Sequence, residues 1–173
     1  MNMDKLTNKS REALLSAQNI AVNSGHTELR ALHILAGLLA DETGLVTSIL
    51  EKCGVNVALF RGKMEAELGK LPRLEGGNQP NPPASREFGL ALNRAMQYAQ
   101  EMKDEYISVE HLLLGVMAES KETAALLEHS GVTQEKVMQA LQSLRGNQRV
   151  ISNGSSFSSR SGAYNQFFCS WNI

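Results

Sequence analysis

The sequence contains one apolar helical stretch twice. The residues ELRALHILAGLL at 28–39 return as YISVEHLLLGVM at 106–117, an offset of 78 positions. Further along the chain the offset becomes 77, and LEKCGV at 50–55 corresponds to LEHSGV at 127–132. The shared residues are mostly small and apolar and recur at helical spacing, as expected for a duplicated packing unit. The duplication predicts two similar halves.

Each half is expected to contain four helices, bounded by capping residues and glycine stops. The expected helices are Thr7–Ser24, Arg30–Ala40, Leu45–Lys52 and Asn56–Leu68, then Ser85–Met102, Ser108–Ala118, Glu122–His129 and Thr133–Leu144. No stretch alternates strictly between apolar and polar residues, so no strand is expected. The sequence therefore predicts an all-α fold.

The four prolines mark the connection between the halves, because proline breaks a helix and restrains the residue before it. We expect one domain over 1–148, made of repeat one (1–70), a linker (71–84) and repeat two (85–148). The remaining residues, 149–173, are rich in serine and end in YNQFFCSWNI. We expect this tail to be disordered and its aromatic end to self-associate weakly.

The charge balance excludes several classes of partner. Lys and Arg number 17 and Asp and Glu 18, so the chain lacks the basic excess of a nucleic-acid binder or a protein attracted to anionic lipid. The polar start resembles no secretory signal, and two cysteines form no disulfide framework. We expect a cytoplasmic, monomeric protein without nucleic-acid or membrane partners.

Five separated stretches closely resemble the Clp repeat domain at the N-terminus of ClpB-type disaggregases. They are LTNKSREAL, LPRLEGG, DEYISVEHLLL, GVTQEKVMQAL and LRGNQRV, in the order found in that family. The resemblance covers about residues 1–150. It implies two four-helix repeats related by a pseudo-twofold axis. It also implies a module that receives unfolded or aggregated polypeptide and passes it to a hexameric ATPase ring.

The ATPase modules of that family would follow residue 150, but the chain ends 23 residues later and contains no phosphate-binding Gly-x-x-x-x-Gly-Lys-Ser/Thr loop. No Ser/His/Asp or Cys/His arrangement indicates catalysis either. We expect the receiving module without the motor: no catalytic residues, no cofactor and no enzyme activity. The alternative is a stand-alone adaptor or regulator that docks on a Clp-type ATPase hexamer.

His33 and His111 stand at matching positions of the two repeats. A metal or proton-transfer pair is one interpretation, but neither histidine belongs to a ligand set with metal-binding spacing. The simpler interpretation is a polar residue that joins a loop to a helix. We therefore expect no metal site.

The resemblance places substrate-binding residues at Thr7, Arg94, Tyr98, Asp104, Glu110 and His111. Two simpler interpretations stay open. Glu110, in the first turn after Ser108, is also explained by the helix dipole, and Tyr98 also fits the edge of the core. In the ClpC branch a glutamate before each repeat's histidine reads phosphorylated arginine. Here only Glu110 matches, because Leu32 occupies the other position.

Overall fold

The computed structural model describes residues 3–76, 80–146, 148–152 and 154. It confirms the all-α prediction, since eight α-helices and one short 3₁₀ helix (Met3–Lys5) occupy the described residues and no strand does. The helices are α1 (Asn8–Asn23), α2 (Ala31–Leu38), α3 (Leu45–Lys52), α4 (Val57–Gly69), α5 (Arg86–Glu101), α6 (Val109–Glu119), α7 (Lys121–His129) and α8 (Gln134–Arg145). The tail expectation concerns residues that lie mostly outside the described part.

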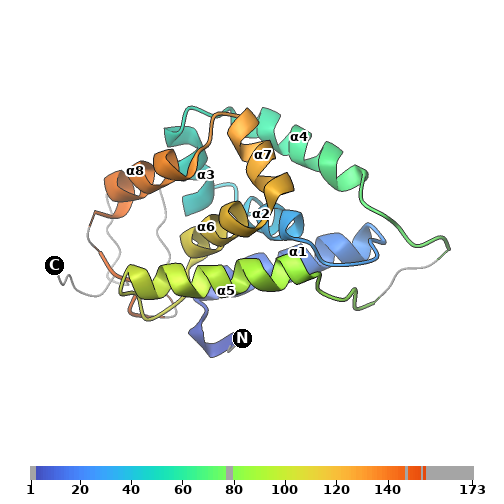
Figure 1. The fold of residues 1–173 in the computed structure, drawn as a ribbon, viewed down its shortest axis with the longest axis horizontal. Coiled ribbons are helices and arrows are strands. Elements are labelled where there is room, and N and C mark those ends of the chain that lie inside the picture. Colours follow the sequence, from blue (N-terminus) through green and yellow to red (C-terminus); the bar gives the residue numbers. More distant parts are fainter. Residues whose placement is uncertain (1–2, 77–79, 147, 153, 155–173) are drawn as a thin grey trace.

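The repeated stretch forms the centre of the molecule. All eight residues of α2 are buried, as are eight of the eleven residues of α6. Figure 1 shows α2 and α6 between the long helices α1 and α5 on one side and α3, α4, α7 and α8 on the other. A helix that is apolar on all sides needs this enclosed position, because no face of it is suited to water.

The repeated glycine allows each central helix to touch its long neighbour. A Cβ atom at Gly37 would lie 2.1 Å from the backbone oxygen of Ala13, and one at Gly115 would lie 2.3 Å from that of Ala91. Both distances are too short for any side chain. The α1–α2 and α5–α6 pairs therefore depend on glycine in the central helix and alanine in the long one.

The two halves exchange backbone hydrogen bonds reciprocally. Residues 5–7, which lead into α1, bond on both sides of Ile107 in the second half, at 2.7 and 3.0 Å. Residues 83–85, which lead into α5, bond in the same way to Leu29 in the first half, at 2.8 Å on each side. Both segments and both loops correspond at the offset of 78. The exchange is the geometry of a pseudo-twofold axis between the repeats.

The repeats share one hydrophobic core. Across the centre α2 packs on α6, α3 contacts α6 and α8, and α7 contacts α2. Val150, two residues beyond the expected end of the domain, is also buried, at 3% exposed. No helix within the described residues is long and apolar enough to cross a membrane.

Candidate functional site

The six predicted site residues fall into two groups. Arg94 lies on the outer face of α5 with 32% of its side chain exposed. The others are buried, with residue exposures of at most 8%. They are Thr7, Tyr98, Asp104, Glu110 and His111.

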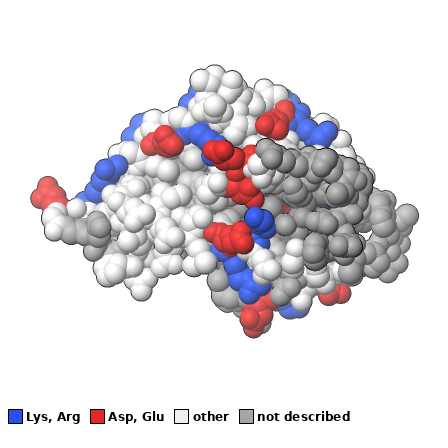
Figure 2. Space-filling model, turned by 180° about the vertical axis from the view of Figure 1, so that it is seen from behind, with Lys and Arg blue, Asp and Glu red and all other residues white. Residues whose placement is uncertain are grey.

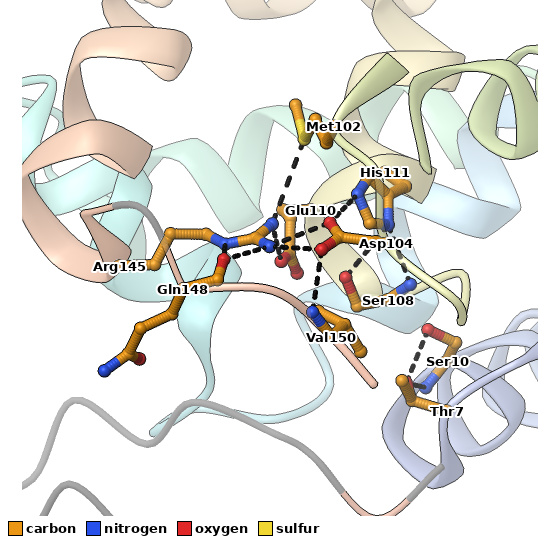
Figure 3. A network of polar contacts seen from close by, with 10 residues as sticks. All are labelled: Thr7, Ser10, Met102, Asp104, Ser108, Glu110, His111, Arg145, Gln148 and Val150. Atoms are coloured by element: carbon orange, nitrogen blue, oxygen red, sulfur yellow. Dashed lines mark hydrogen bonds and ion pairs between the residues drawn. The ribbon is translucent and has the colours of Figure 1, made fainter. Parts of the chain in front are cut away.

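Asp104 is the centre of a buried charge cluster (Figure 3). Its side chain is fully buried in the loop after α5, and both carboxylate oxygens accept hydrogen bonds from Arg145 at 2.8 Å. One oxygen also accepts the backbone N–H of Val150 at 2.7 Å, and the other lies 2.9 Å from Nε2 of His111. Asp104 thus fastens the segment after α8 to the loop before α6.

Arg145 completes this cluster from the last turn of α8. Its Nη1 donates to the carboxylate of Glu110 at 2.9 Å, and its Nε and Nη2 donate to the backbone oxygen of Gln148 at 2.9 and 2.6 Å. Only 9% of the side chain is exposed. Glu110, the position that suggested phosphoarginine recognition, is therefore paired with an arginine of the same chain.

No pattern in the sequence pointed to Arg145. The available signal was the apolar sequence that follows Glu110, since a carboxylate that is buried beside such a helix requires a cation nearby.

The charges in the cluster stabilise one another. Burial alone would raise the pKa of Asp104, but the contact with His111 and the charge and hydrogen bonds of Arg145 bring it below its usual value. Burial likewise opposes the charge of Arg145, yet the carboxylates of Glu110 and Asp104 raise the pKa of the guanidinium. Asp104 and Arg145 are therefore both charged in the folded protein.

His111 joins the cluster to the start of α6. Its Nδ1 accepts the backbone N–H of Ser108 at 3.0 Å, so in the neutral ring the proton lies on Nε2, which faces Asp104. His33 repeats this arrangement in the first half. Its Nδ1 accepts the backbone N–H of Arg30 at 2.9 Å, and its Nε2 lies 2.8 Å from Nδ1 of His26.

The first repeat has the same geometry without the charges. At the offsets of the repeat, the positions of Asp104, Glu110 and Arg145 are held by His26, Leu32 and Leu68. Pro72 takes the place of Val150, as their equivalent backbone hydrogen bonds show. The backbone N–H of Thr27 donates to Pro72 at 3.1 Å, as that of Glu105 donates to Val150 at 2.8 Å. The backbone N–H of Val150 needs the carboxylate of Asp104 as its acceptor. Pro72 has no N–H, so the first repeat needs no carboxylate there.

The histidine pair of the first repeat is held neutral. Burial, followed by the electrostatic influence of the neighbouring His26 ring and of Arg30, lowers the pKa of His33 to about 4. Burial and then the charge of Arg73 also lower the pKa of His26. In both repeats the histidine thus satisfies a backbone N–H at the start of a central helix. The described residues contain no group of three His, Cys, Asp or Glu side chains that could hold a metal ion.

Thr7 has a structural role at the start of α1. Its Oγ1 accepts the backbone N–H of Ser10 at 3.2 Å and lies 2.9 Å from the Ser10 hydroxyl. This is the N-cap that the sequence predicted, an interaction of about 0.5–2 kcal/mol. Equivalent side-chain caps begin α4 at Asn56, α5 at Ser85 and α8 at Thr133.

The outer face of α5 brings Arg94 and Tyr98 together. The guanidinium carbon of Arg94 lies 4.4 Å from the centre of the Tyr98 ring, a cation–π contact, and Nη1 lies 3.5 Å from the carboxylate of Glu101. The Tyr98 hydroxyl accepts a hydrogen bond from Gln134 of α8 at 2.8 Å. Leu90, one turn before Arg94, is 39% exposed. This face offers an apolar side chain and a planar cation that is stacked on a buried tyrosine ring.

Charge is mixed on the face of the molecule opposite to Figure 1. In Figure 2 blue and red side chains alternate along a central band, and the visible described residues form no large patch of one sign. Such a face does not attract a polyanion.

The comparisons with known proteins agree on one family. The Clp repeat (R) N-terminal domain family matches residues 5–129. The chaperone protein ClpB of Nitratidesulfovibrio vulgaris is 38% identical over 156 residues, which make up 88% of this chain and 18% of the relative. The chain thus spans less than a fifth of the length of that relative.

Two solved structures share the fold at low sequence identity. The Hsp104 N-terminal domain from Candida albicans has a TM-score of 0.77 and 20% identity, with 86% of this chain and 97% of that chain covered. A ClpV N-domain in complex with a VipB peptide has a TM-score of 0.64 and 19% identity, with 80% and 85% covered.

Proposed function

The chain belongs to the Clp repeat N-terminal domain family, and we propose that it receives unfolded or aggregated polypeptide for a ClpB-type disaggregating chaperone. The observation that carries this proposal is the 38% identity to a ClpB protein across 88% of the chain. The same relationship supports a cytoplasmic location and a Clp-type ATPase hexamer as the partner that takes over the polypeptide.

We place the client contact on the outer face of α5, around Leu90 and Arg94, whose guanidinium is stacked on the buried ring of Tyr98. Unfolded chains expose apolar side chains and backbone carbonyls. A half-exposed leucine and a guanidinium stacked on a ring can bind both without sequence selectivity. The few exposed apolar groups favour weak binding, which suits a module that has to release its client.

The buried members of the predicted site act by positioning in this proposal. Thr7 holds the start of α1, and His111 holds the start of α6. Asp104 and Glu110, bound to Arg145, fix the chain on either side of the α5–α6 loop. Their side chains are too enclosed to touch a client directly, but their loss would shift the end of α5.

A second candidate function is an adaptor that docks on a Clp ATPase and binds a defined partner peptide. It is favoured by the solved ClpV N-domain, a relative in fold that is bound to a VipB peptide. An adaptor would bind a Clp hexamer in the absence of clients. A receiving module would bind an unfolded protein in the absence of a hexamer.

Fluorescence anisotropy tests the proposal with a labelled, reduced and alkylated protein that cannot refold. We expect saturable binding that is weakened at least threefold by Arg94→Ala and by Leu90→Ser. The matched controls are Arg86→Ala on the same helix and Leu59→Ser on α4, where the leucine is 67% exposed. Absence of binding, or equal loss in the control variants, would contradict a client surface on α5.

A further inference from the structure

Two cavities lie at equivalent places in the two repeats. One, of about 350 Å³, is lined by α1, α2 and α4, and the other, of about 360 Å³, by α5 and α8. Five lining residues of α4 correspond at the offset of 77 to lining residues of the other cavity, among them Met64 to Leu141 and Gly69 to Gly146. Volumes of this size accept apolar side chains of a ligand.

The first cavity has an apolar floor and a basic rim. The buried floor residues are Leu39, Met64 and Leu68. The rim carries two cations, Arg61 and Arg73, against one carboxylate, Glu65. Arg61 is engaged only loosely, since the carboxylate of Glu42 lies 3.5 Å away and is 81% exposed. His26 also lines the cavity.

The second cavity repeats this composition with different residues. Its apolar lining includes Leu141 and Met138, which is 41% exposed at the rim. The rim again carries two cations, Lys103 and Arg149, against one carboxylate, Glu101. Arg145 is also part of the lining, but its charge is neutralised by the buried cluster.

We infer that the two cavities are paired binding sites for extended polypeptide in which an apolar side chain stands next to an acidic one. The apolar floor takes the apolar side chain, and the rim, with a net positive charge, attracts the carboxylate. Methionine at such a surface adapts to side chains of different shape. The inference rests on the proposed function, which it refines by naming a class of client segment.

The equivalent places of the two cavities, beside α4 in one repeat and α8 in the other, support this pairing. The rim charges come from non-equivalent positions, since Met138 and Gln142 of the second cavity stand where Arg61 and Glu65 stand in the first. Each cavity nevertheless has a similar volume, an apolar lining and two cations against one carboxylate at its rim. Two weak sites on one module also raise the avidity for a long chain that carries several such segments.

The chain offers a matched pair of variants for a test. Gly69 lines the first cavity, and a Cβ there meets no atom within 4 Å, so Gly69→Trp fills the cavity mouth without a backbone clash. Gly62 lies on the same helix with the same free space and lines neither cavity, so Gly62→Trp is the control. Met138→Glu adds a negative charge at the second rim.

The probe is a labelled twelve-residue peptide with two Leu–Asp pairs in a Gly/Ser background, titrated into the full chain. We expect Gly69→Trp and Met138→Glu each to weaken binding at least threefold, the double variant at least tenfold, and Gly62→Trp to bind like the parent. Peptides with Lys in place of Asp, or Ser in place of Leu, should bind at least fivefold more weakly.

Equal binding of the Lys and Asp peptides, or equal binding by the Gly69→Trp and Gly62→Trp variants, would overturn the inference. Such a result leaves the proposed function testable separately, because the alkylated unfolded protein and the Arg94→Ala variant report on the α5 face. If the parent chain does not bind the alkylated unfolded protein, the proposed function itself is contradicted.

Discussion

The first repeat has His26, Leu32 and Leu68 at the positions of the charged residues Asp104, Glu110 and Arg145. This difference allows a quantitative test of what the buried charges contribute to stability. Arg145→Leu leaves the carboxylates of Asp104 and Glu110 buried without their cation. Removing one partner of a buried ion pair costs about 3–5 kcal/mol. In a domain of this size that lowers the melting temperature by about 6–20 °C.

The triple variant Asp104→His, Glu110→Leu, Arg145→Leu copies the residues of the first repeat, His26, Leu32 and Leu68. Apolar replacement of a whole buried ion network is often neutral, so most of the loss should return. The remaining cost should be about 1–3 kcal/mol, because the N–H of Val150 loses its acceptor. Urea unfolding followed by circular dichroism at 222 nm measures all three chains. A triple variant as unstable as Arg145→Leu would refute this explanation.

Three further predictions concern the fold. His33 has a folded pKa of about 4, below its unfolded value, so stability should fall as pH drops from about 6.5 towards 4, by up to about 3 kcal/mol. His33→Gln keeps an acceptor for the N–H of Arg30 without titrating, so urea midpoints at pH 7 and 5 should differ less than in the parent. Gly115→Ala should cost at least about 1–3 kcal/mol in the same assay, because its Cβ overlaps the backbone of α5, whereas Gly89→Ala, in open space on α5, should not destabilise. A chain ending at residue 152 should melt cooperatively at the parent's temperature, and failure to fold would show that residues 153–173 are part of the domain.

The sequence predicted the helices well because their ends are local. Thr7 and Asn56 cap through their own side chains, and the observed helices begin one residue later, as an N-cap requires. The repeat in the sequence also predicted two similar halves. Gly37 and Gly115 are equivalent in it because each allows the same close contact between two helices.

The site could be predicted only in part, because its partners are distant in the chain. Asp104 and Arg145 are 41 positions apart, and no local pattern shows that they meet. The sequence named Asp104 and Glu110 through family resemblance, but it did not show that both are enclosed. The paired cavities depend on how α4 and α8 pack, which only the three-dimensional arrangement shows.

The most direct test of client binding is a ¹H–¹⁵N correlation spectrum of the chain titrated with one protein in its native and its unfolded, alkylated form. With the unfolded form we expect progressive shifts of amide signals between residues 90 and 101 of α5. The native form should leave the spectrum unchanged. Equal shifts with both forms, or no shift on α5 with the unfolded form, would contradict the proposal that this domain receives unfolded polypeptide through that face.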